Sequence, residues 1–552
     1  MRRPCLAAVA LLAALTACRP RADLVIYNGM VWTGASSGGP QRGAVAIRGD
    51  TIFLIGDSAT VAQYAGRRTA TLDAAGGLVM PGFGDGHTHF ISGGFQLASI
   101  DLRDAASPQE FIRRLGEYAK GRPAGEWILG GDWDHELWAG APLPRRAWID
   151  SVTRNNPVFI SRLDGHMALA NTAAIRAAGV TRQTRAPVGG EIPRDRVGEP
   201  IGIFKDAAMD LIYAAIPAPT PEQTDSALAR GLAHAASLGV TATSHVSATW
   251  EELASWRRLH DAGRLTMRAY LYMPLSQWRA VAESVRIAGA GDDWVRIAGM
   301  KGVMDGSAGS RTAYFFAPFA DSAGYAGILT TVEDSMRAWM GNADSAGLQL
   351  AVHAIGDRAN ALLLQIFDSV AKVHGERDRR FRDEHAQHLR AQDIPRFSRL
   401  GVIPSMQPYH AVDDGRWLER RIGPQRIKTT YAFRALLDND ARLAFGSDWT
   451  VAPLDPLLGV DAAVTRRTID GRYPGGWIPT ERITLGDALR AYTAGNAYAV
   501  FAEKKWGTLA PGYYADVVVL DKNLFAIDAE SLATARVRYT IVGGKVVFGQ
   551  PE

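Results

Sequence analysis

Cysteine is almost absent from this chain of 552 residues, which contains only Cys5 and Cys18. Both lie near the N-terminus, so the rest of the chain offers no thiolate ligand for a metal and no cysteine nucleophile. A disulfide framework is excluded for the same reason. The residues left to carry metal or acid–base chemistry are histidines, carboxylates and lysines.

An excess of charge of one sign is also lacking, because 61 Lys and Arg residues face 57 Asp and Glu residues and leave a net charge of +4. No stretch gathers Lys and Arg along one face, so nucleic acid is not an expected partner. Internal repeats and low-complexity tracts are missing too. The hydrophobic share of 47% is that of a globular chain, with enough apolar material for one large core or two.

The first residues are predicted to be an export signal and not part of the fold. A basic start, Met1 to Arg3, precedes an apolar run at 5–17 that is too short to remain as a membrane span. The run ends in Leu15-Thr16-Ala17-Cys18, which resembles a bacterial lipobox. We therefore expect residues 1–18 to be a lipoprotein signal peptide that ends at a lipidated Cys18, and the protein to be exported, membrane-anchored and facing the periplasm. A plain secretory signal with a chance cysteine is the alternative.

Both ends of the chain are rich in predicted strands. Near the N-terminus these are 24–29, 44–47 and 51–55, and near the C-terminus 515–521 and 537–547. Two β-rich ends around a long middle predict one small composite β-sandwich, built from residues 22–80 and 500–552.

The middle of the chain, residues 81–499, alternates strand-like and helix-like runs. Candidate strands lie at 158–162, 240–245, 294–303, 349–353, 402–406 and 443–445. Candidate helices between them lie at 221–238, 331–346 and 358–373. Regular alternation indicates a parallel sheet, and this many units favours an α/β fold with a closed (β/α)8 barrel of the TIM type. A doubly wound open sheet is the alternative.

One part of the middle, at about 101–213, is longer than a single barrel unit requires. It contains two tryptophan-rich stretches and a run rich in Gly and Pro at 187–200. We expect an inserted subdomain or lid there.

The strongest chemical signal is the pair His87 and His89, at the end of an apolar strand where a barrel would begin. Histidines two positions apart on a strand point the same way, so both imidazoles can reach one metal ion. Such pairs also occur on hydrated strand faces. The position at the start of a barrel favours the metal site.

Three further candidate ligands end other strands: His353, His385 and Asp448. Barrel enzymes place their catalytic groups at the carboxyl ends of the strands, which meet at one mouth. Imidazole and carboxylate are the ligands that a metal such as zinc prefers. The sequence therefore predicts a metal site assembled from several strands.

Lys301 lies inside an otherwise apolar predicted strand. Burial of an unpaired ammonium is expensive, so its pKa is lowered, it pairs with a carboxylate such as Asp305, or it is modified. A neutral lysine can react with carbon dioxide to form a carbamate, an anionic ligand that bridges two metals. The alternative is a lysine whose ammonium reaches solvent at the barrel mouth.

Together these motifs resemble the amidohydrolase superfamily, and within it the amidohydrolase-3 branch that includes enzymes like N-substituted formamide deformylase. The resemblance covers nearly the whole chain after the signal. It rests on seven motifs: Pro81-Gly82-Phe83 with Asp85, His87 and His89; Asp164-Gly165-His166 with Asn171; Gly189-Gly190-Glu191-Ile192; Lys301 with Asp305-Gly306-Ser307 and Arg311-Thr312-Ala313; His353-Ala354-Ile355-Gly356-Asp357; Glu384-His385-Ala386-Gln387; and Gly446-Ser447-Asp448.

The resemblance implies a role for each matching position. His87 and His89 would bind the more buried metal, and His353 and His385 the second. Lys301 matches a position that is a carboxylated, bridging lysine in members with two metals. Asp448 would touch the first metal and act as general base. The implied cofactors are one or two divalent ions, preferably zinc, with a carbamate derived from CO2 on Lys301.

The implied activity is hydrolysis of an amide-type, non-peptide C–N bond in a small molecule by metal-activated water. An esterase or lactonase with the same site is an alternative, and so is a lipid-anchored binding protein without turnover. The sequence leaves the substrate and the oligomeric state open, with a homo-oligomer as one alternative.

Other side chains are weaker candidates, each with a structural alternative. The substrate-binding candidates are Arg162, His166, His245, Ser307 and Arg311. His166 could instead fix the insertion, His245 could be a hydrogen-bonded core histidine, and Ser307 and Arg311 could cap a helix.

Three aromatic residues and four further histidines also have a functional or a structural interpretation. Trp133, Trp138 and Tyr409 could wall an aromatic pocket or simply pack. His388 competes with His385 as a ligand, and the family pattern favours His385. The remaining histidines in helical stretches are expected to be structural or exposed: His234, His260 and His374.

Overall fold

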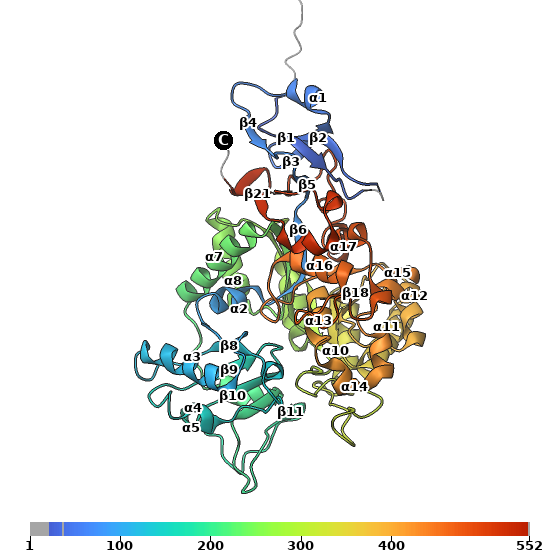
Figure 1. Cartoon of the computed structure of the whole chain (residues 1–552). Helices are drawn as coiled ribbons and strands as arrows, with labels where there is room; N and C mark the ends of the chain where they lie inside the picture. Colours follow the sequence, from blue (N-terminus) through green and yellow to red (C-terminus); the bar gives the residue numbers. More distant parts are fainter. Residues whose placement is uncertain (1–20, 36–37, 550–552) are drawn as a thin grey trace, which may run out of the picture.

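The computed structural model describes residues 21–35 and 38–549. Cys5 and the predicted lipidation site Cys18 lie outside these residues. The described chain forms three sheets, which Figure 1 shows as a terminal unit at the top, a barrel in the middle and an inserted unit at the lower left. In this part of the chain, no helix combines the length and the apolar character that crossing a bilayer requires.

Eight parallel strands form the barrel sheet and pair with one another in chain order. They are β6 (Phe83–Thr88), β13 (Val240–Val246), β14 (Arg268–Pro274), β15 (Val295–Val303), β16 (Gln349–Ala354), β17 (Arg382–His385), β18 (Ile403–Met406) and β19 (Ala444–Phe445). Parallel neighbours require crossover connections, which helices supply. The predicted α/β barrel is confirmed, and the open doubly wound sheet is excluded.

Helices cover the outside of this barrel (Figure 1). The predicted helices at 221–238, 331–346 and 358–373 are confirmed to within two residues as α7, α10 and α11. The helices outside the inserted unit are α1 (Ser58–Ala62), α2 (Phe90–Gln96), α7 (Pro221–Ser237), α8 (Trp250–Asp261), α9 (Trp278–Ala288), α10 (Glu333–Ser345), α11 (Asp357–His374), α12 (Ile394–Leu400), α13 (Pro408–Asp414), α14 (Leu418–Arg426), α15 (Phe433–Asp438), α16 (Pro456–Thr465), α17 (Leu485–Ala491) and α18 (Ala494–Ala499).

The first and last barrel strands meet beside the predicted metal ligands. Thr88 and Trp449 form a parallel bridge between β6 and the chain that follows β19. The backbone N–H of Asp448 donates to the carbonyl oxygen of His87 at 2.7 Å. These contacts nearly close the barrel and hold Asp448 against the end of β6.

A separate sheet fills the chain between β6 and β13. Its strands are β7 (Ile100–Asp101), β8 (Gly130–Trp133), β9 (Phe159–Arg162), β10 (Met167–Ala170), β11 (Gly190–Glu191) and β12 (Ile203–Asp206), and its helices are α3 (Pro108–Lys120), α4 (Arg146–Ile149), α5 (Thr172–Ala177) and α6 (Asp210–Tyr213). The strand predicted at 158–162 is therefore β9 of this sheet and not a barrel strand. Trp133 and Trp138 pack in its core, so they do not wall an aromatic pocket.

The two ends of the chain share one sheet in the terminal unit. Its strands are β1 (Leu24–Val31), β2 (Gln41–Arg48), β3 (Thr51–Gly56), β4 (Ala70–Asp73), β5 (Leu78–Pro81), β20 (Val517–Leu520), β21 (Val537–Val542) and β22 (Lys545–Phe548). The junction is the antiparallel pairing of β5 with β20. The strand pairing is continuous through this unit, so the finer prediction of a two-layer sandwich stays a prediction.

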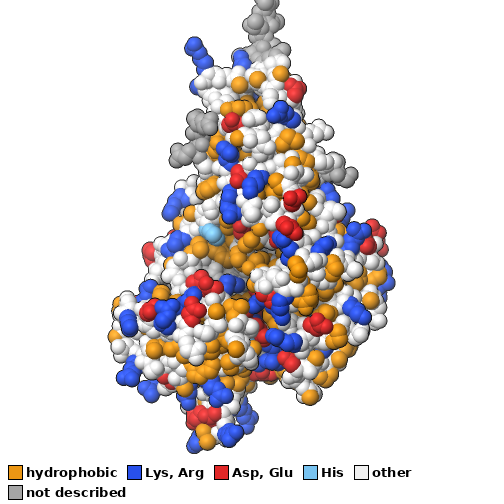
Figure 2. Space-filling model, in the orientation of Figure 1, with side chains coloured by type: hydrophobic (Ala, Val, Ile, Leu, Met, Phe, Trp, Pro, Cys, Tyr) orange, Lys and Arg blue, Asp and Glu red, His pale blue; other side chains and the backbone are white. Residues whose placement is uncertain are grey.

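Figure 2 shows these parts in space-filling form, with side chains of both charge signs interspersed over the face in view. The inserted unit is a distinct lobe at the lower left of that view. Over the described residues that Figure 2 displays, no large field of one charge sign stands out.

A buried ion pair connects the barrel to the terminal unit. Arg268, the first residue of β14, donates from Nε to Asp516 at 2.6 Å and from a terminal nitrogen at 3.2 Å. Both side chains are almost fully buried. Asp516 directly precedes β20 and also accepts from the backbone N–H of Gly543 at 2.8 Å.

We predict that Asp516→Ala lowers the free energy of unfolding by about 3–5 kcal/mol, because it leaves the Arg268 guanidinium buried without its partner. Guanidinium chloride denaturation followed by circular dichroism would measure the loss. The matched control is Glu117→Ala, which removes an exposed ion pair with Arg113 and should change stability by less than about 0.5 kcal/mol. Equal denaturation curves for the two variants would contradict this account.

Candidate metal centre

A cavity of about 450 Å³ lies between the mouth of the barrel and the inserted unit. All six predicted ligands line it: His87, His89, Lys301, His353, His385 and Asp448. The inserted unit contributes a wall that includes Arg162, Asp164 and His166. Residues separated by hundreds of positions in the sequence are therefore brought to one place, as strand ends at a barrel mouth require.

Three of the six side chains are grouped closely enough to hold one metal ion. His87, His385 and Asp448 are buried, and each offers a ligand atom within 4.8 Å of the others. Oδ1 of Asp448 lies 3.6 Å from Nε2 of His87 and 3.5 Å from Nε2 of His89. That oxygen is buried and has no hydrogen-bond partner among the described residues. A buried carboxylate oxygen without a donor, surrounded by imidazoles, fits a divalent cation such as zinc.

Two of these positions have an uncommon backbone conformation. His385 has φ of 78° and Asp448 has φ of 57°, in the left-handed region that non-glycine residues seldom occupy. Ser447 helps to hold the second turn, because its hydroxyl donates to Asp85 at 2.6 Å. Asp85 is buried, and burial raises its pKa to about 7. The left-handed conformations of His385 and Asp448 cost roughly 1–3 kcal/mol for each residue, and strain of this kind is typical of functional sites.

Lys301 lies beside the first ligand and not at the surface. Its Nζ is 3.2 Å from Nε2 of His87, and its side chain is buried. Burial lowers the pKa of Lys301 to about 8, against the opposing effect of nearby Glu384 and Asp448. The alternative of an ammonium that reaches solvent is therefore excluded.

The pairing of Lys301 with Asp305 is not observed. Asp305 instead accepts hydrogen bonds from the backbone N–H groups of Tyr314, Ile355 and Gly356 at 2.7 to 3.0 Å. Its role is to fix the loop that follows β16. The carboxylates that act on the Lys301 ammonium are those of Glu384 and Asp448.

Glu384 supports His87 from the barrel interior, a role that the sequence reading missed. Its Oε2 lies 2.6 Å from Nδ1 of His87, and its Oε1 accepts from Nε of Arg382 at 2.7 Å. All three side chains are fully buried. A carboxylate on Nδ1 places the proton there and leaves the lone pair of Nε2 for a metal. The signal was present in the sequence, since Arg382 and Glu384 are two apart on one strand and buried charges require partners.

We predict that Glu384→Gln weakens metal binding by about 10- to 100-fold, the usual effect of losing a carboxylate behind a ligating histidine. Competition with a fluorescent zinc chelator would measure the affinity. Glu283→Gln, an exposed glutamate on α9, is the control and should bind as the natural chain does. Unchanged affinity in a folded Glu384→Gln protein would show that His87 needs no support from this carboxylate.

Two of the candidate substrate-binding residues from the inserted unit line the cavity. Arg162 pairs with Asp134 at 3.2 Å and with Asp164 at 2.7 Å, so its charge is balanced. Nδ1 of His166 lies 2.6 Å from Asp206. Although burial opposes it, this carboxylate raises the pKa of His166 to about 9. His166 thus carries a positive charge at neutral pH, and its ring centroid is 5.0 Å from that of His353.

The other three candidates have different environments. Ser307 donates to Asp164 at 2.5 Å and lines a smaller, inner chamber. Nδ1 of His245 accepts from the indole of Trp256 in α8 at 3.1 Å, so His245 is the hydrogen-bonded core histidine of the alternative. Arg311 pairs with Asp321 at 3.0 Å, outside the cavity lining. Neither His245 nor Arg311 is among the residues that line the cavity.

His388, the alternative to His385 as a metal ligand, is not among the residues that line the cavity. Nδ1 of His388 lies 2.8 Å from the hydroxyl of Thr430, and its ring packs against Phe315. His385, and not His388, lines the cavity.

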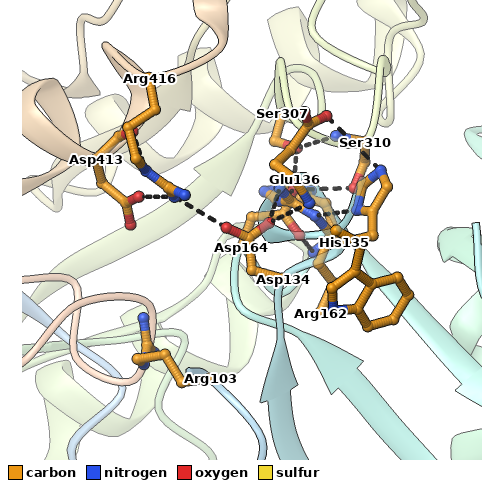
Figure 3. A network of polar contacts seen from close by, with 12 residues as sticks. Arg103, Asp134, His135, Glu136, Arg162, Asp164, Ser307, Ser310, Asp413 and Arg416 are labelled. Carbon is orange, nitrogen blue, oxygen red and sulfur yellow. Dashed lines mark hydrogen bonds and ion pairs between the residues drawn. The ribbon is translucent and has the colours of Figure 1, made fainter. Parts of the chain in front are cut away.

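Buried ion pairs join the inserted unit to the barrel (Figure 3). Asp134, which follows β8, pairs with Arg162 and also with Arg416, 2.9 Å away, which follows α13. Asp164 accepts from the hydroxyl of Ser310 at 2.9 Å. The wall of the cavity is therefore fixed to the barrel by charged contacts that solvent does not screen.

Several known proteins resemble this chain in sequence or in structure. A sequence model of the Amidohydrolase family matches residues 70–548. "Protein LONG AFTER FAR-RED 3" of Arabidopsis thaliana is 37% identical over 539 residues, which cover 96% of this chain and 92% of that protein. N-substituted formamide deformylase of Arthrobacter pascens is 26% identical over 546 residues, or 95% of this chain and 97% of the deformylase.

A solved structure shares the fold. The crystal structure of an uncharacterized metal-dependent hydrolase from Pyrococcus horikoshii OT3 aligns with a TM-score of 0.74 at 27% identity. The alignment covers 92% of this chain and 99% of the archaeal one. The likeness therefore includes the terminal, barrel and inserted parts together.

Proposed function

The chain belongs to the amidohydrolase family and is a metal-dependent hydrolase, and from this premise we propose that it cleaves an amide-type, non-peptide C–N bond in a small molecule. The observation that carries the proposal is the unpartnered, buried Oδ1 of Asp448 between His87 and His89, at the floor of a cavity of about 450 Å³. The likeness to N-substituted formamide deformylase, an enzyme named for an amide substrate, favours a C–N bond over an ester.

The six cavity ligands are proposed to hold one or two divalent ions, preferably zinc. His87, His89 and Asp448 would hold the first ion, and His353 and His385 the second. The rings of His353 and His385 support a shared ion, because their centroids are 4.5 Å apart. When bound, a divalent ion supplies Lewis acidity and lowers the pKa of water toward neutrality.

Lys301 is proposed to carry a carbamate. Its neutral amine would form an N–C bond with carbon dioxide and release one proton, giving a carbamate whose single negative charge is shared by two oxygens. The burial of Lys301 and its distance of 3.2 Å to Nε2 of His87 support this, because an ammonium there would repel a metal. Carbon-13 NMR of protein equilibrated with labelled bicarbonate should show a carbamate signal that Lys301→Met lacks.

The remaining chemistry is assigned to side chains of the cavity. Asp448 would accept the proton of the attacking water at a carboxylate oxygen and pass it to the leaving nitrogen. The positively charged His166 would donate to the oxygen on which negative charge develops, since its Nδ1 is already engaged by Asp206. The wall of the inserted unit would exclude bulk water.

Metal analysis combined with a substrate screen would test the proposal. Purified protein should contain one or two equivalents of metal and hydrolyse at least one amide; chelation should abolish turnover and zinc should restore it. Hydrolysis of esters or lactones without any amide would favour the esterase alternative. Bound metal without turnover in the whole screen would favour a binding protein.

Export and a lipid anchor at Cys18 are also proposed, on the strength of the lipobox-like run that ends there. The terminal unit, where β1 begins at Leu24, lies at the opposite end of the molecule from the inserted unit (Figure 1). An anchor at Cys18 would therefore leave the cavity directed away from the membrane. Mass spectrometry of the N-terminal peptide should find a diacylated cysteine, and an unmodified Met1 would refute the anchor.

A further inference from the structure

A second, smaller chamber adjoins the metal centre. Its volume is about 50 Å³, which is room for only one or two water-sized groups at roughly 30 Å³ each. The chamber shares three ligand residues with the larger cavity: His353, His385 and Asp448. A molecule that reacts at the metal centre can therefore extend into both spaces, with a compact group in the smaller one.

The wall of the small chamber is acidic and incompletely balanced. Of its carboxylates, Asp164 pairs with Arg162 and Asp413 pairs with Arg416. Asp414 receives hydrogen bonds from neutral groups, the Tyr431 hydroxyl at 2.5 Å and the Gln387 amide at 2.8 Å.

Asp414 has no cationic partner in an ion pair within residues 21–35 and 38–549. The other cation that lines the chamber, His166, is already paired with Asp206. Burial, with a contribution from Asp413, raises the pKa of Asp414 to about 7. A cation inside the chamber would therefore be stabilised by a carboxylate that forms no ion pair with a described side chain, although the charges of Arg162 and Arg416 lower its pKa.

His410 is a second polar residue of the same chamber. It lines the space, and its Nε2 is buried without a hydrogen-bond partner in the described part of the chain. A neutral imidazole has one nitrogen that accepts a hydrogen bond. A buried polar atom left without a partner costs about 1–3 kcal/mol. A donor on the ligand would remove that cost.

Trp417 completes the lining of the chamber. The guanidinium of Arg421 already lies over its indole ring, 5.5 Å from the ring centroid, so the ring does not by itself select a cation. An apolar group in the chamber would leave Asp414 and His410 unsatisfied, and an anion would be repelled by Asp414. A small donor with a positive charge supplies both a hydrogen bond for His410 and a counter-charge for Asp414.

We propose that this chamber is the subsite for a primary ammonium group of the substrate, which donates to Asp414 and His410 beside the ring of Trp417. The substrate class is then an amide that carries a primary amino group close to the scissile bond. This inference rests on the proposed function, because it takes the metal centre as the reacting end of the cavity.

Methylammonium is the probe for the subsite itself. In a saturation-transfer NMR titration of the zinc-loaded full chain, methylammonium should bind, and Asp414→Asn should weaken it by about ten-fold, the effect of losing one charge-assisted hydrogen bond. Asp438→Asn, in an exposed ion pair on α15, is the matched control and should bind as the natural chain does. Tetramethylammonium has the same charge but should not bind, because it cannot fit or donate.

A pair of amide substrates tests the same subsite during turnover. The two amides differ only in an ammonium or a methyl group at the same position. The natural chain should prefer the ammonium compound in kcat/KM by about ten-fold, and Asp414→Asn should remove the preference. If Asp414→Asn does not fold, as judged by circular dichroism, His410→Leu takes its place and should weaken methylammonium binding.

The outcomes separate this proposal from the proposed function. The ammonium subsite is overturned if methylammonium fails to bind the natural chain. It is also overturned if Asp414→Asn and His410→Leu bind methylammonium as tightly as the natural chain does. Hydrolysis of amides with no preference for the ammonium compound would do the same and leave the hydrolase intact. Methylammonium binding that depends on Asp414, in a protein that hydrolyses no amide, would refute the proposed function alone.

Discussion

His87→Ala is expected to lose bound metal and to lower kcat/KM by on the order of 10³-fold or more, because the variant loses the chemistry that the metal supplies. His87 lies close to three other ionisable side chains of the site. Its Nε2 lies 3.2 Å from Lys301 and 3.6 Å from Asp448, while its Nδ1 lies 2.6 Å from Glu384. Alanine removes the imidazole that joins the ligand set to the carboxylate behind it.

The measurements are metal content by mass spectrometry and kcat/KM on whichever substrate the screen identifies. Circular dichroism should confirm that His87→Ala folds. His260→Ala is the control, because His260 lies in α8 on the outside of the barrel and is partly exposed. A His87→Ala protein with full metal content and full activity would remove the metal centre from this account.

Asp448→Asn is expected to keep most of its metal but to lower kcat by about 10²- to 10⁴-fold, the usual contribution of a general base. Asparagine has nearly the same shape, and it also tolerates the left-handed conformation that Asp448 adopts, with φ of 57°. Its amide oxygen can still bind a metal, but it cannot take a proton from water. The variant therefore separates proton transfer from metal binding, which His87→Ala cannot do.

Steady-state kinetics and metal analysis on the same preparation would test this separation. Asp461→Asn is a suitable control, since Asp461 is a partly buried aspartate of α16 that lies outside the cavity lining. Equal losses of metal and rate in Asp448→Asn would indicate a ligand without a role as base. Retention of kcat would move the general base to another residue.

The sequence predicted the ligands because their signal is local. His87, His353 and Asp448 each end an apolar run, and a strand end in a parallel barrel has one location, the mouth. The helices α7, α10 and α11 were predicted for a similar reason, since each has a long amphipathic pattern. A short pattern was also sufficient for β19, because its two residues, Ala444–Phe445, lie within the strand predicted at 443–445.

What the sequence did not predict depends on which side of a strand a residue faces and on contacts between distant segments. Ser244 contacts Arg382 inside the barrel, so its neighbour His245 must face the outer helices. A shift of one position along the strand therefore decides whether a side chain faces the barrel interior or the outer helices. Asp414 and His410 were missed because they come from α13, and only the folded chain brings that helix to the inner chamber.

The contact between the two ends of the barrel has a consequence for the timing of metal uptake. Asp85 and Ser447, which join β6 to the last turn of the site, are 362 positions apart. At a synthesis rate of about 5–20 residues per second, the carboxylate of Asp448 is made roughly 20–70 s after the imidazole of His87. Until then the growing chain offers histidines without the carboxylate and without the closed barrel that aims them. Tight binding of the ion thus requires that synthesis has passed residue 448. A chain that ends before this residue would differ from a finished one in its metal content.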